Sequence, residues 1–370
     1  MKHHRILRVT AFLLALALLF GAAAQAFAGE QHQITQRTPL LDERGQLTEP
    51  GYCVTNLYDY DRSAIKARPT RIKEWDFYQI SNRHWMLQVT ISDISLGGAG
   101  VFTLVNLKTG ERYEAMSLSL LTFGSFHMES DAMTPHTLSR HRPFFHLDID
   151  VHAGETKIDF SARNGGENFK ADLSLAMMDG LESLVMAVPF PEHEGCFYLN
   201  QKINSMPVSG TVTVGDLTVT FDPADTFALL DWGRGVWPYA ESWYWGNGTT
   251  RLENGDLFGF EIGWGFGDMS AASENTLFYN GKAHKIGEIT MQKDDEDWLA
   301  PWTFTSDDGR FEMTMTPYFD NFTSTRVLGL VGNICHQVFG KWNGTVTLDD
   351  GTVLEIRNMD AFCELSDNRW

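Results

Sequence analysis

The sequence predicts an all-β protein made of antiparallel barrels or sandwiches. Short segments that alternate polar and apolar residues recur along the chain and are rich in Val, Ile, Phe, Tyr and Thr. Asn-Gly and Asp-Gly pairs stand between several of them and suit tight hairpin turns, because both residues tolerate positive φ. Beyond residue 30 we find no strongly amphipathic segment of twelve or more residues, which disfavours a parallel α/β sheet.

The expected strands and turns follow in chain order. The strand-like segments are 84–94, 101–107, 157–162, 184–190, 211–214, 217–221, 256–262, 311–316, 345–348 and 352–356. The hairpin signals are Gly215-Asp216, Asn254-Gly255, Asn280-Gly281, Asp308-Gly309 and Asp350-Gly351. We interpret the glycine-rich segment 97–100 as a turn and expect at most one helical turn, near 226–230.

Two consecutive domains are expected, at 29–205 and 206–370. A chain of 370 residues is long for one core. Residues 197–207 are polar and irregular, and the hairpin that starts at Thr211 opens a new unit. Each half is long enough for one barrel of about eight to ten strands, and an eight-stranded barrel has room for one small ligand.

Residues 1–28 predict a secretory signal peptide. Three basic residues are followed by an apolar run over 9–20 and then by Ala26-Phe27-Ala28, a typical cleavage site. The run is too short for a permanent membrane anchor, and no later stretch is apolar enough to span a bilayer. We therefore expect an exported, periplasmic protein, cleaved after Ala28.

The charge of the chain excludes one class of partner. The formal net charge is −19, and removal of the three basic residues of 1–28 changes the balance to 26 − 48 = −22. So acidic a chain repels phosphate backbones, which disfavours nucleic-acid binding. It is also repelled by anionic membranes unless its charge is locally segregated.

The cysteines and histidines do not form a recognisable metal site. None of the four cysteines stands in a C-x-x-C pair. Cys335 and Cys363 flank the last hairpin and are the favoured disulfide, whereas small buried hydrophobic residues are the alternative for Cys53, Cys196 and this pair. Four histidines between 136 and 152 have no ligand spacing, and nucleotide and zinc-protease motifs are absent, so we expect no metal and no cofactor.

The segment 231–245, DWGRGVWPYAESWYW, is the densest in chemistry. Six of its fifteen residues are Trp or Tyr, and alternation places Trp243 and Trp245 on one face of a strand. One interpretation is a structural corner in which Arg234 stacks on tryptophan. The other is an aromatic-walled pocket that contains Arg234 and an acid, Asp231 or Glu241.

The candidate site residues derive mainly from this segment. The candidate catalytic residues are Asp231, Arg234, Glu261 and His336. The candidate ligand-binding residues are Trp232, Trp237, Tyr239, Trp243, Trp245 and Trp264. His336 with Gln337 is a weaker pair, and Glu74 and Asp76 form either an acidic site or, as we favour, a solvated face.

Several motifs together resemble the uncharacterised family called domain of unknown function 2804, over about residues 38–370. They are the segments 231–239 and 243–245, 73–78, 265–268, 273–275, 301–302, 337–340 and 364–370. The family is in turn similar to the two-barrel, lipocalin-like group of carotenoid 1,2-hydratases and tocopherol cyclases. This resemblance implies two lipocalin-like barrels and an apolar ligand, but no catalytic residues can be transferred. It also implies an amide where this chain has Glu261, so that a pocket there would gain a charge.

Three functions are compatible with these observations. The first is a carrier or sensor of an apolar molecule such as a fatty acid or isoprenoid. The second is a cofactor-independent hydratase, cyclase or isomerase, which needs a neutral carboxylic acid and aromatic faces to protonate an alkene-bearing lipid. The third is an envelope structural or interaction protein without a ligand. A buried carboxyl with a raised pKa that faces an apolar cavity would favour the second.

Overall fold

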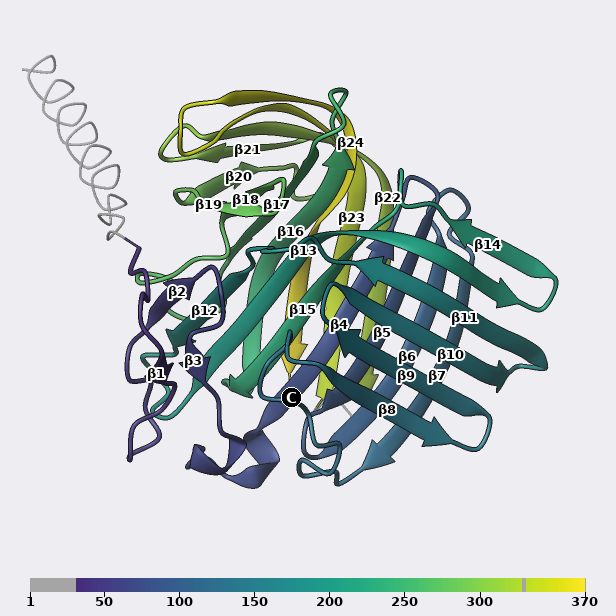
Figure 1. Cartoon of the computed structure of the whole chain (residues 1–370), viewed down its shortest axis with the longest axis vertical. Coiled ribbons are helices and arrows are strands. Elements are labelled where there is room, and N and C mark those ends of the chain that lie inside the picture. The colour runs from purple at the N-terminus through teal and green to yellow at the C-terminus, as the bar shows by residue number, and fades with distance from the viewer. Residues whose placement is uncertain (1–30, 328–330, 370) are drawn as a thin grey trace, which may run out of the picture. The chain divides into compact units, whose positions relative to one another are not determined.

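The computed structural model describes residues 31–327 and 331–369, so the predicted signal peptide lies outside the described residues. Nearly all regular structure in the described part is β-strand, which confirms the predicted fold class (Figure 1). Its two helices are 3₁₀ turns, η1 (Arg62–Ala64) and η2 (Pro69–Arg71). A short parallel pair, β1 (Thr38–Pro39) and β3 (Tyr58–Asp59), lies near its start. No helix in this part of the chain is long and apolar enough to cross a membrane.

The first large sheet has the order β7-β6-β5-β4-β15-β13-β11-β10-β9-β8, with β12 and β14 also paired to β13, and β2 to β12. Its strands are β2 (Gly51–Cys53), β4 (Lys73–Ser81), β5 (Trp85–Asp93), β6 (Gly97–Asn106), β7 (Arg112–Leu120), β8 (His136–Arg142), β9 (Phe145–His152), β10 (Glu155–Asn164), β11 (Glu167–Ala176), β12 (Leu184–Pro189), β13 (Phe197–Val214), β14 (Leu217–Phe221) and β15 (Phe227–Val236). The sheet curls, so that β7 approaches β9 and β10 around a hydrophobic core.

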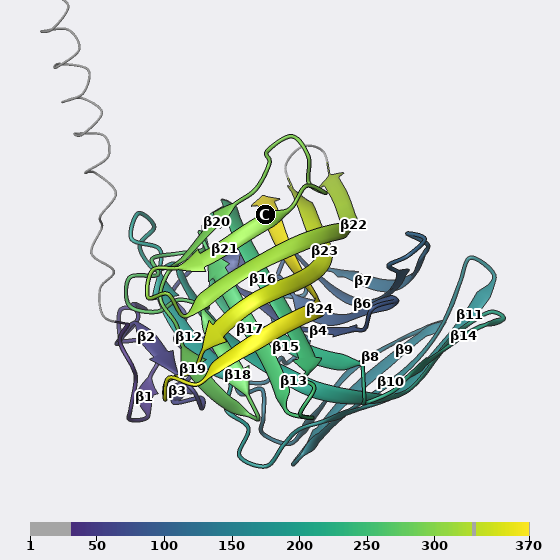
Figure 2. The same cartoon turned by 90° about the horizontal axis from the view of Figure 1, so that it is seen from above.

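The second large sheet has the order β19-β18-β17-β16-β24-β23-β22-β21-β20. Its strands are β16 (Ala240–Arg251), β17 (Leu257–Trp264), β18 (Thr276–Tyr279), β19 (Lys282–Lys285), β20 (Ile289–Gln292), β21 (Trp302–Ser306), β22 (Phe311–Val327), β23 (Val331–Thr347) and β24 (Val353–Arg369). It also curls, and β17 approaches β20 around a second core. The long strands β16 and β22–β24 extend past this core and lie over the outer face of the first sheet (Figure 2).

The predicted hairpins all lie at strand connections, and their glycines have positive φ. Only Asn280-Gly281 has positive φ at both residues, so the type I′ geometry fits this turn alone. Two local predictions were wrong. Residues 97–100 begin β6 and are not a turn, and residues 226–230 lead into β15 and are not a helical turn, because pairing with neighbouring strands overrides local preference.

The chain passes from the first sheet to the second later than residue 205, the predicted domain boundary. That residue lies inside β13, at an irregularity in the pairing of β13 with β15, and β15 still belongs to the first sheet. The chain changes sheets between Val236 and Ala240. The division into two folding domains stays a prediction.

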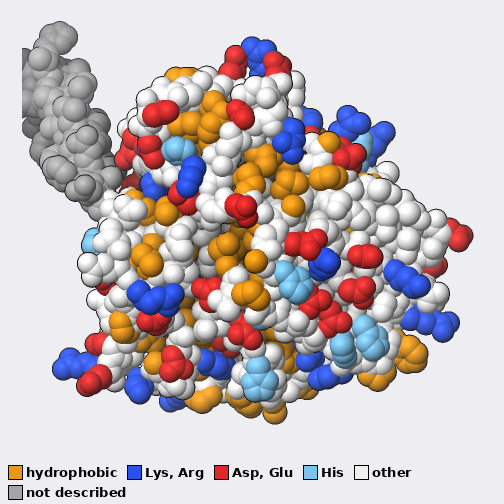
Figure 3. Space-filling model, viewed as in Figure 1, with side chains coloured by type: hydrophobic (Ala, Val, Ile, Leu, Met, Phe, Trp, Pro, Cys, Tyr) orange, Lys and Arg blue, Asp and Glu red, His pale blue; other side chains and the backbone are white. Residues whose placement is uncertain are grey.

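Acidic and basic side chains are mixed over the face shown in Figure 3.

Candidate functional site

A cavity of about 360 Å³ lies between the outer face of the first sheet and the long strands of the second. Its walls come from β4, β5, β13 and β15 on one side, and from β16 and β22–β24 on the other. Seven aromatic side chains line it, together with a larger number of polar side chains, most of which lie on β5 and β22–β24. Such walls can bury the apolar part of a ligand against the aromatic rings and orient its polar part by hydrogen bonds.

On the first sheet, three cavity residues form one row across neighbouring strands. Lys202 on β13 lies opposite Asp231 on β15, and Asp231 lies opposite Phe77 on β4. Residues that lie opposite each other in a sheet point to the same face, so this row faces the cavity together.

On the second sheet a matching row faces it. Gln337 on β23 lies opposite Glu364 on β24, and Glu364 lies opposite Trp245 on β16. The two rows touch, because the Lys202 Nζ atom lies 4.0 Å from the centre of the Trp245 ring. Such a contact is an attractive cation–π interaction.

The remaining aromatic side chains close one end of the cavity. Trp75 stacks on Tyr198 with ring centres 5.9 Å apart and meets Trp237 edge to face at 5.0 Å. Gly233 makes this packing possible, since a Cβ atom at that position would lie 2.2 Å from the Trp75 ring. Both glycines beside Arg234 lie within strand β15. Gly233 leaves the space that the Trp75 ring fills.

The polar end of the cavity has one buried cation. Lys202 Nζ lies 3.1 Å from Asp231 Oδ2 and 3.7 Å from Glu274 Oε1. Burial works to lower the pKa of Lys202, but Asp231, Glu274 and Glu261 together raise it well above its usual value. Burial raises the pKa of Glu274 to about 6, against the opposing effect of Lys202. The lysine is therefore a permanent positive charge at neutral pH.

Glu364 is the carboxyl group best placed for chemistry. It lines the cavity, only 8% of it is exposed, and it accepts a hydrogen bond from Gln337 Nε2 at 3.2 Å. The Cys335 thiol donates to it at an Sγ–Oε2 distance of 3.7 Å. Burial raises the pKa of Glu364 to about 7; Lys202 opposes the rise and Asp231 adds to it. A substantial fraction of this group is therefore protonated at neutral pH.

Glu261 lies behind the cavity wall and does not line it. Its carboxyl accepts hydrogen bonds from Trp245 Nε1 at 2.8 Å, from Asn204 Nδ2 at 3.2 Å and from Asn247 Nδ2. Burial raises the pKa of Glu261 to about 8, although Lys202 opposes it. The added charge expected from this glutamate is therefore largely absent at neutral pH, because the carboxyl keeps its proton.

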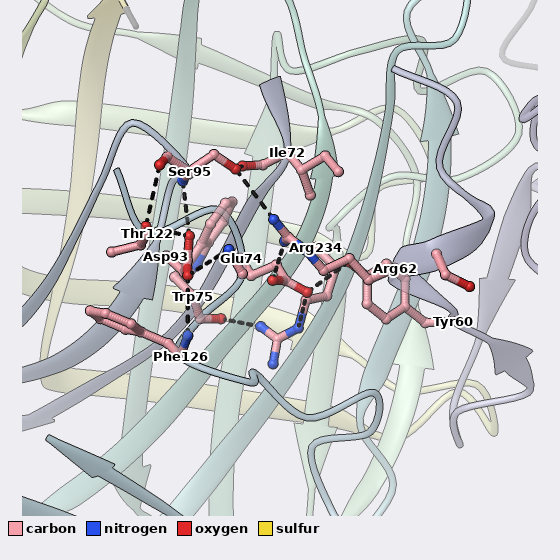
Figure 4. A network of polar contacts seen from close by, with 12 residues as sticks. Tyr60, Arg62, Ile72, Glu74, Trp75, Asp93, Ser95, Thr122, Phe126 and Arg234 are labelled. Atoms are coloured by element: carbon pink, nitrogen blue, oxygen red, sulfur yellow. Dashed lines mark hydrogen bonds and ion pairs between the residues drawn. The ribbon is translucent and has the colours of Figure 1, made fainter. Parts of the chain in front are cut away.

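Arg234 and Trp232 lie on the opposite face of β15, in the core of the first sheet. Arg234 is fully buried and donates to Asp76 at 2.9 Å and to the backbone oxygen of Glu129. It also donates to the backbone oxygen of Trp75 (Figure 4). Its guanidinium stacks on Trp232 with 4.0 Å between the charge and the ring centre. The structural-corner interpretation therefore describes Arg234, and neither residue contacts the cavity.

Glu74 and Asp76 are buried, so the favoured solvated face was wrong. Glu74 accepts from Tyr60 Oη at 2.8 Å and pairs with Arg62 and Arg234. Burial raises the pKa of Glu74, and the two arginines oppose this rise. The alternation that places both carboxylates on one face was correct, but that face is the core.

The other candidates lie apart from the cavity. The His336 Nδ1 atom lies 2.7 Å from Asp320 Oδ2, and the ring stacks on Trp298 with centres 3.9 Å apart. Trp264 stacks on Tyr244 with centres 5.0 Å apart, outside the cavity wall. Tyr239 is exposed, and Glu241 is half-buried outside the cavity. Of the candidates, the structure brings together Asp231, Trp237, Trp243 and Trp245.

Sequence reasoning missed three charged residues of the cavity. Glu274 and Glu364 stand within segments that carry the family resemblance, and this was the available signal. Lys202 stands in the segment 197–207, which was interpreted as a polar link between domains. Its role depends on pairing with β15, which no local pattern reveals.

The cysteines are free in the structure, so the favoured Cys335–Cys363 disulfide is not formed. On the neighbouring strands Cys335 lies opposite Ser366, and Cys363 lies opposite Val338. Cys335 faces the cavity, whereas Cys363 packs in the second core as a small hydrophobic residue. In the part of the chain that the structure describes, no three His, Cys, Asp or Glu side chains are grouped as metal ligands would be.

Comparison with known proteins establishes the family. The model of the family described as "Domain of unknown function (DUF2804)" matches residues 31–370, so the chain belongs to this family and the resemblance seen in the sequence is confirmed. No curated protein matches the sequence.

Two solved structures are similar to parts of this chain. One, from Nitrosomonas europaea and described as an AttH protein, is 11% identical, covers 80% of this chain and 92% of its own, and has a TM-score of 0.48. The other is kievitone hydratase from Nectria haematococca, which is 11% identical, covers 80% of this chain and 88% of its own, and has a TM-score of 0.43.

Proposed function

We propose that this member of the DUF2804 family is a cofactor-independent enzyme that binds an apolar, alkene-bearing molecule between its two sheets and protonates it with Glu364. One observation carries the proposal: a buried carboxyl with a pKa raised to about 7 lines an aromatic cavity. A general acid works best when its pKa lies near the working pH.

The walls of the cavity fit the ligand and the reaction. Tryptophan and phenylalanine faces bury apolar carbon, and the same faces stabilise a positive charge that develops on it. Trp245 stands directly beside Glu364 in the sheet, so the acid and an aromatic face meet at one place. The cavity volume of about 360 Å³ suits a small molecule or one segment of a lipid chain.

Hydration illustrates the step. The Glu364 hydroxyl gives its proton to one alkene carbon, and the π electron pair becomes the new C–H bond. The adjacent carbon carries the positive charge, which an aromatic ring of the cavity wall other than Trp245 stabilises, since Lys202 already lies over Trp245. The oxygen of a water molecule then forms the C–O bond, and its surplus proton returns to the Glu364 carboxylate. Loss of a proton from a neighbouring carbon instead gives isomerisation.

The Lys202–Asp231 ion pair at the polar end of the cavity influences the pKa of Glu364. Asp231 raises the pKa of Glu364 and Lys202 lowers it, so the pair sets the proton affinity of the acid near neutrality. Lys202 also provides a fixed positive charge that orients a polar group of the ligand. Turnover should fall as the pH rises above about 7, because Glu364 then loses the proton that it donates.

The test uses the lipids that accompany the protein. Protein purified from its own host is extracted with solvent, and the lipids found by mass spectrometry are incubated with fresh protein in D2O. The expected result is a product with deuterium on carbon, and Glu364→Gln should reduce its rate by about 100-fold or more. Glu241→Gln is the matched control, since burial also raises the pKa of this acid but it lies outside the cavity.

Two results would contradict an enzyme. Lipids that bind but gain no deuterium with any variant would indicate the carrier function. The absence of any bound lipid, together with equal melting of all variants, would favour a structural protein.

We also propose export to the periplasm, on the basis of residues 1–28. N-terminal sequencing of the mature protein should begin Gly-Glu-Gln-His. A mature pool that retains Met1 would contradict this proposal.

A further inference from the structure

Exposed hydrophobic side chains are concentrated where the curled first sheet brings its two ends together, on β7 with the loop after it and at the β8–β9 turn. Six of the thirteen exposed large hydrophobic side chains in the described part of the chain lie there, and we call this set the apolar edge surface. Its members are Met116, Leu118, Leu120, Leu121, Phe123 and Phe144. In Figure 3 hydrophobic side chains also gather along the lower border of the molecule. Such contiguous patches mark interaction sites more often than scattered single residues do.

The strand at this edge has its apolar side chains on the outside. Met116, Leu118 and Leu120 of β7 are exposed, and Leu120 is 85% accessible. The side chains between them, Ser117 and Ser119, point to the other face and are less exposed. Strand β7 ends the sheet order, and natural edge strands usually carry charges that prevent association. This edge has the opposite pattern.

The adjoining loops hold their apolar residues in costly conformations. Leu121, Phe123 and Phe144 have φ of 54°, 47° and 64°, a region that side chains other than Gly, Asn and Asp rarely adopt. The buried Asp93 carboxylate fixes the first loop, because it accepts hydrogen bonds from Thr122 Oγ1 at 2.7 Å and from the Gly124 amide at 2.9 Å (Figure 4). The structure therefore maintains the exposure of these side chains.

The apolar edge surface is continuous with the cavity. One row of directly paired residues crosses the face of the first sheet from the buried ion pair to β7, and it consists of Lys202, Asp231, Phe77, Thr90, Val101 and Met116. Paired residues share a face, so the row forms one surface. Its five strand spacings of about 4.8 Å span about 24 Å. A second path joins Ser92 of the cavity wall through Ala99 to Leu118.

Basic residues flank this surface although the chain is strongly acidic. Arg142 and Arg163 are exposed, and neither forms an ion pair with a carboxylate in the described part of the chain. The Arg163 amide donates to the Phe144 carbonyl at 3.0 Å, so Arg163 adjoins the surface at the β8–β9 turn. Arg142 ends β8 before this turn, and it reaches Ser119 Oγ at 3.4 Å on the face of β7 opposite to Leu118 and Leu120. Glu114, at the far end of the β7 row, is paired with Arg112 at 3.0 Å. Two exposed arginines without a carboxylate partner among the described residues therefore border this surface.

We propose that the apolar edge surface docks on an anionic phospholipid membrane, and that the apolar ligand passes from it across the sheet face into the cavity. The side chains of Leu118, Leu120 and Phe144 enter the acyl boundary, and Arg142 and Arg163 meet the phosphate groups. The route of the ligand rests on the proposed function, whereas docking itself does not.

The test is co-sedimentation of the mature chain with vesicles. Vesicles of phosphatidylethanolamine with phosphatidylglycerol should bind the protein, and vesicles of phosphatidylcholine alone should bind it less. The double variant Leu118→Gln/Leu120→Gln should weaken binding at least about tenfold. Val353→Gln is the matched control, since Val353 is exposed on the second sheet and should leave binding unchanged. Arg142→Gln should reduce binding to the anionic vesicles alone.

Several outcomes would overturn docking. They are no binding of the parent protein to anionic vesicles, equal binding of the double variant, or a dimer that the double variant dissociates while vesicles bind neither. Vesicle binding needs no turnover, so it can fail while Glu364 remains active. Conversely, an inactive protein that binds vesicles would contradict the proposed function alone.

Discussion

The two faces of strand β15 carry two buried ion clusters of different character. Asp231 points to the cavity, where it meets Lys202. Three residues later Arg234 points to the core, where it meets Asp76. The two side chains are close in sequence but lie on opposite sides of the sheet, because successive residues of a strand alternate between its faces.

The core cluster is balanced in charge. Two arginines, Arg62 and Arg234, meet two carboxylates, Glu74 and Asp76. The guanidinium of Arg234 also donates to backbone oxygens at 2.7–3.1 Å, so its hydrogen-bonding capacity is used. A cluster of this kind fixes the chain locally and has no group left over for a ligand.

The cavity cluster is not balanced. Among the described residues Lys202 is the cation that lines the cavity, and four carboxyl groups interact with it: Asp231, Glu274, Glu261 and Glu364. Lys285, outside the lining, acts on Glu274 as well. Burial raises the pKa of the last three, to about 6, 8 and 7 respectively. The two clusters thus differ in their ion pairing: in the core cluster each of Glu74 and Asp76 pairs with an arginine, whereas in the cavity cluster a single lysine interacts with several carboxyl groups, three of which have pKa values raised towards neutrality.

The largest effect should come from breaking the balanced cluster. Arg234→Met should lower the free energy of unfolding by about 3–5 kcal/mol, because Glu74 and Asp76 would remain buried with less compensation. Urea unfolding at pH 7 measures this. Arg163→Met, an exposed arginine of the same sheet, should change it by less than about 0.5 kcal/mol. If Arg234→Met and Arg163→Met unfolded with equal free energies, the core cluster would not be a main source of stability.

This comparison also explains what the sequence could predict. Alternation and Asn-Gly or Asp-Gly turns are local, and they identified the all-β fold, the hairpins and the shared face of Trp243 and Trp245. The density of aromatic and charged residues in 231–245 indicated a candidate site. It did not show that some of these side chains point to the cavity and others to the core. Lys202, Glu274 and Glu364 meet there only through pairing between distant strands. Long-range register therefore limited the prediction of the site.

A smaller effect should appear in the pH dependence of stability. The folded chain binds the Glu261 proton up to about pH 8, whereas an unfolded glutamate releases it near 4.5. Stability from the protonated group is thus complete below about pH 4.5 and is lost as the pH rises through 8. Glu261→Gln, whose amide resembles the protonated acid, should be more stable than the parent at pH 7 by on the order of 3 kcal/mol.

Unfolding by urea at a series of pH values measures this difference. The advantage of Glu261→Gln should vanish near pH 4.5 and grow as the pH rises. If the unfolding free energies of variant and parent changed with pH in parallel, Glu261 would be ionised in the folded chain. The cavity cluster would then not hold a proton on Glu261 at neutral pH.

The smallest effect should come from Asp231→Asn, and it tests whether an unbalanced cluster compensates for a lost charge. The asparagine oxygen can still accept the hydrogen bond from Asn200 Nδ2, which is 2.6 Å long in the parent. Lys202 loses its closest carboxylate but keeps Glu274 at 3.7 Å and the Trp245 ring at 4.0 Å. Asp231 raises the pKa of Glu274 and of Glu364, so its removal should lower both pKa values. These carboxyls then ionise and replace the missing charge.

The cost of Asp231→Asn in unfolding free energy should therefore be about 1 kcal/mol, well below that of Arg234→Met. The pH at which turnover declines should move downward, because Glu364 loses its proton earlier. Urea unfolding at pH 7 and the pH profile of deuterium incorporation measure the two effects. A loss as large as that of Arg234→Met, with an unchanged pH profile, would make Asp231 a structural counter-ion of Lys202. The charged residues on both faces of β15 would then serve to stabilise the fold.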